Sequence, residues 1–295
     1  MKSILIDKID EIRTTVKEWK KEGLTVGLVP TMGALHSGHE SLIKKAKEKC
    51  DKVIVSIFIN PIQFGPTEDY DKYPRTIEKD VNVCDVNGVD VVFAPTAMEM
   101  YGEDLVNAGG LSNKTLTFVY PPYSLVDKLC GKSRVGHFDG VATVVLKLFN
   151  IVQPDKAFFG QKDAQQLIII EKMVNDLNIP VIIVPCPIVR EDDGLALSSR
   201  NKYLSQKSRL RALSIHRALV AVEQHYSKGI KDTKVLFETA IDALDKTIEL
   251  DYLEFADTKT LESVENINQK TLVAIAAKVD NVRLIDNIIV GENSN

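Results

Sequence analysis

Two histidines three residues apart, His36 and His39, have the type and spacing that most directly suggest chemistry in this sequence. They lie in the stretch Pro30–His39, which also holds Gly33 and Gly38. Glycines let a backbone approach a ligand closely, and unpaired N–H groups at the start of a helix favour an anion. Imidazole exchanges protons near neutral pH. The combination predicts a site where a phosphate group is bound and reacts.

Plainer interpretations of the same stretch stay open. A histidine beside a glycine turn is often only a helix cap or a surface residue, and this stretch alone does not distinguish that from a phosphate site. A metal site is less well supported, because no nearby third ligand completes a familiar spacing with His36 and His39. We therefore predict no protein-bound metal.

The elements around this stretch are those of a strand followed by a helix. The apolar run within Thr25–Val29 is typical of a buried parallel strand. The segment Glu40–Cys50 has the apolar spacing of an amphipathic helix. The histidines are thus expected at the carboxyl end of a strand, where open α/β sheets bind ligands.

Two further strand ends carry polar residues. Asn60 and Gln63 follow the strand predicted for Lys52–Ile59, although ordinary loop capping is the favoured explanation from spacing alone. Lys162 follows Gly160 at the end of a short apolar run, where its charge could neutralise a phosphate. Gln166 lies one helical turn beyond Lys162 and could face the same pocket.

Two other segments could meet an anion. Arg134 and His137 precede a helix predicted for Val141–Val152, and a solvated cap explains them equally well. The segment Val189–Asn201 has no strong periodicity and places two hydroxyl groups beside Arg200. It suits either a mobile phosphate clamp or an interdomain linker.

Strands and helices alternate through the first part of the chain, which predicts an α/β fold with a doubly wound parallel sheet. The exception is the loop-rich excursion Glu99–Leu129, in which Thr115–Val119 has a β-like composition. After residue 189 helices are followed by strands, which favours a smaller α+β domain. We expect a first domain over residues 1–188 and a second, acting as a lid, over residues 189–295.

The elements expected in the second domain are two helices and three strands: Arg209–Lys228, Val235–Leu250, Leu253–Ala256, Thr271–Val279 and Val282–Val290.

Composition excludes several classes of protein. The 295 residues carry a formal net charge of −4 with dispersed Lys and Arg, which argues against nucleic-acid binding. The four cysteines form no Cys-x-x-Cys pair, so a disulfide framework or structural zinc is not expected. Charged residues follow Met1 at once, and the apolar run Val181–Val189 contains two prolines. We therefore expect a cytoplasmic protein without a membrane span.

Familiar nucleotide motifs are absent. No two glycines are separated by a single residue, so the dinucleotide fingerprint cannot occur and hydride transfer is disfavoured. Gly131-Lys132-Ser133 is not a P-loop, because position 126 is Val. A nucleotide would have to bind at another kind of turn.

Several ordered blocks identify a resemblance. Over nearly its whole length the chain resembles the pantothenate synthetase (pantoate–β-alanine ligase) family of the nucleotidylyltransferase superfamily, which has a Rossmann-like fold. The matching blocks are Pro30–His39, Phe58–Phe64, Gly136–Phe138, Phe159–Gln166, Ser198–Asn201 and Arg283–Asn287. Leu197 stands where the family usually has Met, and Met100–Asp127 matches poorly.

The resemblance implies an ATP-dependent ligase, usually a homodimer, that uses Mg²⁺. Pantoate would attack the α-phosphate of ATP to give pantoyl adenylate and pyrophosphate, and β-alanine would then displace AMP. His39, His36, Lys162 and Arg200 would be catalytic, with His39 as the proton donor. The residues implied to contact ATP are Pro30, Thr31, Met32, Gly33, His36, His39, Gly160, Gln161, Lys162, Asp163, Val189, Leu197, Ser198, Ser199 and Arg200. Those implied to contact pantoate or β-alanine are Gln63, Gln166, Asn60, Met32, Arg134 and His137.

Two alternatives differ from this function. One is an adenylyl transferase acting on another acid or on a phosphorylated cofactor precursor. The other is a non-catalytic nucleotide-binding regulator, which we would expect to lack His39, Lys162 or Arg200, although all three are present.

Overall fold

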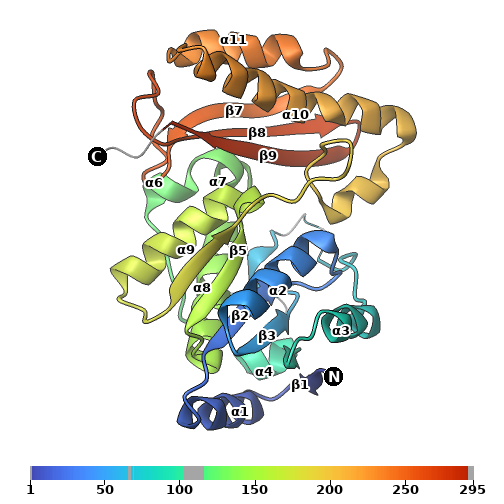
Figure 1. Ribbon diagram of the computed structural model, residues 1–295, viewed down its shortest axis with the longest axis vertical. Coiled ribbons are helices and arrows are strands. Elements are labelled where there is room, and N and C mark those ends of the chain that lie inside the picture. The colour runs from blue at the N-terminus through green and yellow to red at the C-terminus, as the bar shows by residue number, and fades with distance from the viewer. Residues whose placement is uncertain (1, 66–67, 69, 103–115, 292–295) are drawn as a thin grey trace. The chain divides into compact units, whose positions relative to one another are not determined.

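The computed structural model describes residues 2–65, 68, 70–102 and 116–291. The described chain forms two compact units (Figure 1). Unit 1 comprises residues 1–123, 134–161 and 169–187, and unit 2 comprises residues 124–133, 162–168 and 188–295. Compact units need not be domains, so the expected boundary after residue 188 stays a prediction.

Unit 1 is built on a six-stranded sheet in the order β1-β4-β3-β2-β5-β6, and all its strand pairs are parallel. The strands are β1 (Ile4–Ile6), β2 (Val26–Thr31), β3 (Lys52–Ile57), β4 (Val91–Phe93), β5 (Lys156–Gly160) and β6 (Ile182–Cys186). From β2 the chain first adds strands on one side and later on the other, so the order reverses between β2 and β5. Ligands of open parallel sheets bind at such a switch point.

The elements that connect these strands are mostly helices. They are α1 (Ile9–Lys21), α2 (Ser37–Lys49), η1 (Pro61–Gln63), α3 (Ile77–Val86), α4 (Ala97–Tyr101), α6 (Tyr123–Val126), α7 (Leu129–Ser133), α8 (His137–Val152), η2 (Gln161–Asp163) and α9 (Ala164–Asp176). This pattern confirms the predicted α/β class with a parallel sheet.

Side chains alternate between the two faces of a strand, and both faces of this sheet are covered. On one face, Val29, Val55 and Phe158 pack with Ile43 of α2 and Cys84 of α3 in one apolar cluster. On the other face lie α1 and α8, which pack against each other and against β2. Burial on both faces explains why the strands read as continuous apolar runs.

Unit 2 contains an antiparallel sheet, β7-β8-β9, with α10 and α11 packed on it (Figure 1). Its elements after residue 188 are η3 (Ser199–Tyr203), α10 (Gln206–Ser227), α11 (Thr233–Ala243), β7 (Glu249–Asp257), β8 (Thr271–Val279) and β9 (Val282–Val290). Leu219 of α10, Leu236 of α11 and Ile275 of β8 are completely buried in its core. The bounds of β8 and β9 are those predicted from the sequence.

Two sequence-based expectations differ from the structure, the first in where a helix ends and the second in a strand that does not form over the described residues. The helix expected over Val235–Leu250 ends at Ala243. Asp245 forms a turn there, in which its carboxylate accepts the Thr247 N–H at 2.9 Å. The β-like segment expected at 115–119 forms no strand over its described residues 116–119, and residue 115 lies outside the described residues. There the Val119 N–H donates to the hydroxyl of Thr143, 2.9 Å away, instead of to a neighbouring strand.

Candidate functional site

The turn after β2 is held by a buried carboxylate from α3. The N–H groups of Ala34 and Leu35 donate to the two oxygens of Asp80, at 3.0 and 2.8 Å, and Asp80 is only 2% exposed. Gly33 has a φ of +81°, and a Cβ there would lie 3.0 Å from the Asp80 carboxylate. The turn therefore requires glycine, and Asp80 is a part of the site that sequence reasoning did not identify.

His36 and His39 form the start of α2. The Gly38 N–H donates to Nδ1 of His36 at 3.2 Å, and the His36 N–H donates to Nδ1 of His39 at 3.3 Å. The two rings lie 4.1 Å apart between centroids. Since each Nδ1 accepts a backbone N–H, the proton of each neutral ring lies on Nε2. The histidines are therefore helix caps and Nε2–H donors together, so the two interpretations of the motif are compatible.

Three of the residues predicted to bind substrate lie together in unit 1. The side-chain amide of Asn60 donates to Oε1 of Gln63 at 3.1 Å, and Nε2 of Gln63 lies 2.9 Å from Sδ of Met32. Asn60 is 1% and Gln63 is 7% exposed. A buried amide pair beside a thioether offers polar contacts of the kind that orient ligands in small-molecule sites.

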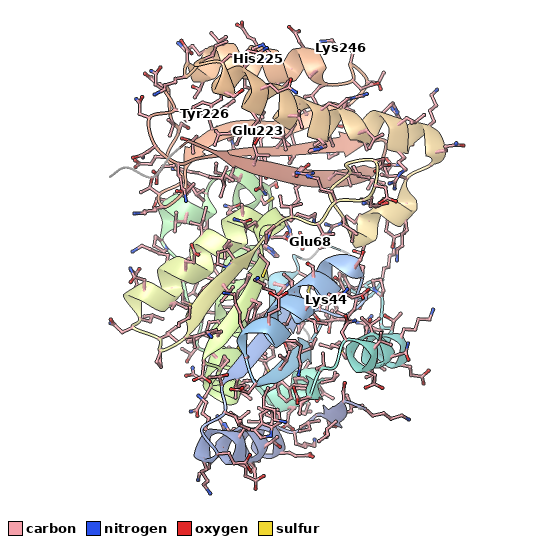
Figure 2. The ribbon with its side chains drawn as sticks, in the orientation of Figure 1. Lys44, Glu68, Glu223, His225, Tyr226 and Lys246 are labelled. Carbon is pink, nitrogen blue, oxygen red and sulfur yellow. The ribbon has the colours of Figure 1, made fainter. Side chains whose placement is uncertain are left out.

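Arg134 is paired with Glu68, which sequence reasoning also missed. Nε and Nη2 of Arg134 donate to the two carboxylate oxygens of Glu68, at 2.6 and 2.8 Å (Glu68 is labelled in Figure 2). This hydrogen-bonded pair lowers the pKa of the Glu68 carboxyl below its usual value. A side chain 66 residues away in sequence carries no motif signal, so only the fold reveals the pair.

The same arginine sets the tautomer of His137. Nη1 of Arg134 lies 2.8 Å from Nε2 of His137, and a guanidinium can only donate. Nε2 therefore accepts, and the proton on Nδ1 donates to the backbone carbonyl of Gln63 at 2.7 Å. Arg134 and His137 thus hold the backbone of Gln63, which is predicted to bind pantoate. A direct contact of Arg134 or His137 with substrate stays a prediction.

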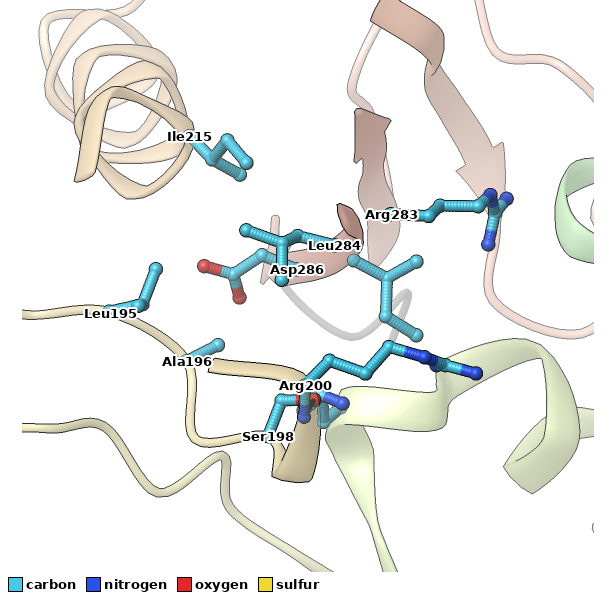
Figure 3. Close-up of a pocket in the computed structure, with 10 residues that line it drawn as sticks. Leu195, Ala196, Ser198, Arg200, Ile215, Arg283, Leu284 and Asp286 are labelled. Atoms are coloured by element: carbon cyan, nitrogen blue, oxygen red, sulfur yellow. Dashed lines mark hydrogen bonds between the residues drawn. The ribbon is translucent and has the colours of Figure 1, made fainter. Parts of the chain in front are cut away.

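The remaining candidates belong mainly to unit 2, where Lys162 lines a pocket. The pocket residues are Lys162, Leu195, Ala196, Ser198, Arg200, Ile215, Arg283, Leu284, Ile285 and Asp286. Figure 3 shows Ser198 and Arg200 on one side of this pocket, with Leu284 and Asp286 of β9 facing them. Three of the residues implied to contact ATP, Lys162, Ser198 and Arg200, therefore line one pocket.

The segment that carries Ser198 is anchored to β9. Arg190 pairs with the buried carboxylate of Asp286 at 2.7 and 3.0 Å and also donates to the Gly194 carbonyl at 3.2 Å. The hydroxyl of Ser198 accepts the Arg200 N–H at 3.2 Å and begins η3. These contacts hold the segment as an ordered hairpin-like loop.

The other predicted ATP contacts occupy defined places. Gly160 ends β5, and Gln161–Asp163 forms the turn η2. The Leu197 N–H donates to the Val189 carbonyl at 3.0 Å, which closes the loop between them. Gln166 is half-buried in the first turn of α9, whereas its neighbour Gln165 is 5% exposed and donates to the Leu125 and Lys128 carbonyls, both at 2.8 Å. Gln165 is thus structural.

Neither a protein metal cage nor a membrane span is found in the described part of the chain. Among residues 2–65, 68, 70–102 and 116–291, no group of three or more His, Cys, Asp or Glu side chains could hold a metal ion. Within the same ranges, no helix is both long and apolar enough to cross a bilayer.

Comparison with known proteins gives a consistent match. Residues 4–289 match the family model described as pantoate-beta-alanine ligase. A pantothenate synthetase from Caldicellulosiruptor saccharolyticus is 52% identical over 289 residues, covering 97% of this chain and 99% of that protein. Pantothenate synthetase from Thermus thermophilus superposes with a TM-score of 0.87 at 39% identity, covering 97% of this chain and 98% of that one. A pantoate-beta-alanine ligase from Francisella tularensis, solved with beta-gamma ATP and beta-alanine, superposes with a TM-score of 0.75 at 35% identity and 97% coverage of both chains.

Proposed function

Because the chain belongs to the pantoate-beta-alanine ligase family, we propose that it joins pantoate to β-alanine through a pantoyl adenylate, releasing pyrophosphate and then AMP. The observation that carries this proposal is the family match over residues 4–289. The Francisella tularensis enzyme, solved with beta-gamma ATP and beta-alanine, supports the choice of ATP and β-alanine as substrates here.

In the first step a carboxylate oxygen of pantoate attacks the α-phosphorus, and the bond from that phosphorus to the bridging oxygen of pyrophosphate breaks. Negative charge grows on the phosphate oxygens and leaves with pyrophosphate. Hydrogen-bond donors and cations stabilise such charge most where water is excluded. The Nε2–H groups of His36 and His39 and the charges of Lys162 and Arg200 are suited to this role. A carboxylate is already a nucleophile at neutral pH, so the step needs no general base.

In the second step the amine nitrogen of β-alanine attacks the acyl carbon of the adenylate. The bond from that carbon to the phosphate oxygen breaks, AMP leaves with the electron pair, and the new amide loses the extra amine proton. The adenylate also reacts with water, so the site must keep water out. Buried polar groups such as Asn60 and Gln63 are consistent with a sheltered binding place for the pantoyl part.

Mg²⁺ belongs to the proposal as a companion of ATP. The ion prefers near-octahedral oxygen ligands and commonly binds through substrate phosphates together with one or two carboxylates. In this proposal the ion enters with ATP, on its phosphate oxygens. When bound there, it neutralises phosphate charge. A homodimer and a cytoplasmic location are further parts of this proposal.

The proposed function is tested by measuring AMP release with pantoate and β-alanine, supplied singly and together. We expect release in step with pantothenate formation only when both are present. Replacing pantoate by other hydroxy acids separates this ligase from an adenylyl transferase of different specificity. Sustained AMP release with another acid but not with pantoate would contradict the proposal.

A further inference from the structure

A row of three buried polar side chains leads from α4 to the amide predicted to bind pantoate. Tyr101, Asn60 and Gln63 are 8%, 1% and 7% exposed. The Tyr101 hydroxyl donates to Oδ1 of Asn60 at 2.7 Å, and Nδ2 of Asn60 donates to Oε1 of Gln63 at 3.1 Å. All three lie in unit 1. Tyr101 matched no motif in the sequence and has no part in the mechanism described above.

The row has one consistent direction. Burial raises the pKa of Tyr101, so its hydroxyl keeps its proton and donates. Nδ2 of Asn60 also donates to the Gly140 carbonyl at 3.1 Å. If the Asn60 amide were turned over, its oxygen would face the Gly140 carbonyl and Oε1 of Gln63, and its N–H groups would face a donor. Tyr101 and Gly140 thus fix the Asn60 amide, which in turn fixes that of Gln63.

The backbone that carries Gln63 is held independently of this row. Nδ1–H of His137 donates to the Gln63 carbonyl at 2.7 Å. Gly140 packs so closely on η1 that a Cβ there would collide with the Ile62 carbonyl. The Tyr101 hydroxyl is therefore not needed to keep η1 in place. Its distinct effect is on which way the side-chain amide of Gln63 points.

The outcome is that Nε2–H of Gln63 points away from Asn60, toward Sδ of Met32 at 2.9 Å. A thioether is a weak acceptor, so this N–H bond is readily exchanged for one to a better acceptor. A hydroxy acid offers such acceptors in its hydroxyl and carboxylate oxygens. With the opposite amide orientation, Gln63 would present an oxygen, which a carboxylate repels.

We propose that Tyr101 is a positioning residue that acts through Asn60 to present the Gln63 amide N–H to an oxygen of the hydroxy-acid substrate. This inference rests on the proposed function, because the substrate is pantoate only if that function holds. It predicts that the Tyr101 hydroxyl governs the binding of the acid and has no effect on the binding of ATP.

Tyr101→Phe removes the hydroxyl alone. Two contacts of the Tyr101 ring do not involve its hydroxyl oxygen. The ring centroid lies 6.0 Å from that of Phe58 and 5.4 Å from Nζ of Lys147. We expect the KM for pantoate to rise roughly tenfold, the scale of one misplaced hydrogen bond, while the KM for ATP stays within about twofold. Tyr252→Phe is the control, because Tyr252 is half-buried and its hydroxyl also contacts a side chain, lying 3.3 Å from Sγ of Cys130. It is expected to change neither KM.

A double-mutant cycle tests whether Tyr101 acts through Gln63. In a Gln63→Ala background, Tyr101→Phe should no longer change the KM for pantoate. Asn60→Asp supplies a second variant should Tyr101→Phe fold poorly, because its carboxylate still accepts from Tyr101 but cannot donate to Gln63. It should raise the same KM selectively.

The outcomes separate this inference from the proposed function. An active wild-type enzyme whose Tyr101→Phe variant keeps its KM for pantoate, or raises both KM values alike, overturns the inference alone. So does a Tyr101→Phe effect that persists undiminished in Gln63→Ala. A wild-type protein with no pantoate-dependent AMP release overturns the proposed function and this inference with it.

Discussion

Asn287 of β9 donates a side-chain hydrogen bond of 2.9 Å to the backbone carbonyl of Lys162, 125 residues earlier in the chain. Asn287 is 4% exposed, and its own N–H donates to the neighbouring Asp286 carboxylate at 2.8 Å. That carboxylate also holds Arg190. The middle of β9 thus supports both the turn that bears Lys162 and the loop that leads to Ser198.

We expect Asn287→Ala to lower kcat by about tenfold to a hundredfold, because a small displacement of a charge-stabilising group is costly in a transition state. Asn87→Ala is the control, since the Asn87 amide likewise donates to a backbone carbonyl, that of Val83, at 2.9 Å. The control should keep wild-type kcat. The measurement is steady-state kinetics beside thermal melting. Equal losses of kcat in the two variants would contradict a specific role for Asn287.

A pair of substitutions at His39 separates capping from proton donation. His39→Asn keeps an acceptor near the place of Nδ1 but removes Nε2–H, so the rate of adenylate formation should fall about a hundredfold with little change in stability. His39→Gln keeps an N–H near the place of Nε2, and a glutamine three residues after the N-cap can still accept the His36 N–H, so the free energy of unfolding should also change little. We expect the Gln variant to be the more active. Higher activity in the Asn variant would exclude the donor role.

The parallel sheet was predictable because its signals are local. Most of the strands are short apolar runs with a glycine or proline nearby, and the elements alternate in sequence. The position of helix starts was less predictable. The helix after β2 begins at Ser37 and not at Glu40, because His36 and His39 satisfy its first N–H groups. Likewise α8 begins at His137, four residues before the expected Val141.

The residues of the candidate site that belong to a sequence motif were predictable. Those that depend on contacts between distant parts of the chain were not. Asn60, Gln63 and Met32 were expected as substrate contacts, and the fold brings them together. No sequence motif marks the residues that support these contacts and the histidine turn, which are Asp80, Glu68 and Tyr101. Their roles depend on pairings across 41 to 66 residues of chain, which no local pattern encodes.

The ion pair of Glu68 with Arg134 predicts a small pH dependence of stability. The folded state lowers the pKa of Glu68, so the pair stabilises the protein above the unfolded value of about 4.3, and this contribution is lost as pH falls through the folded value. Urea unfolding should show Glu68→Gln about 1 kcal/mol less stable than wild type at pH 6, with the difference shrinking toward pH 3. A difference that stays constant over this range would contradict the assignment.

The four cysteines should differ sharply in reactivity. Cys50, Cys84 and Cys186 are 8%, 0% and 2% exposed, and burial raises the pKa of Cys84 to about 12. Cys130 is half-buried, with Nη1 of Arg283 3.6 Å from its sulfur. Iodoacetamide at pH 8 should label native protein at Cys130 at least about tenfold faster than at the others, as mapped by peptide mass. Labelling of Cys84 at the rate of Cys130 would contradict the described core.

Exchange of labelled pyrophosphate into ATP tests the central step most directly, because it reports the reversible transfer of AMP to an acid without the second substrate. With pantoate present and β-alanine withheld, we expect steady exchange that stops when pantoate is left out. If pantothenate forms but exchange occurs only after β-alanine is added, the acid is not activated in a separate step and the proposed mechanism is wrong.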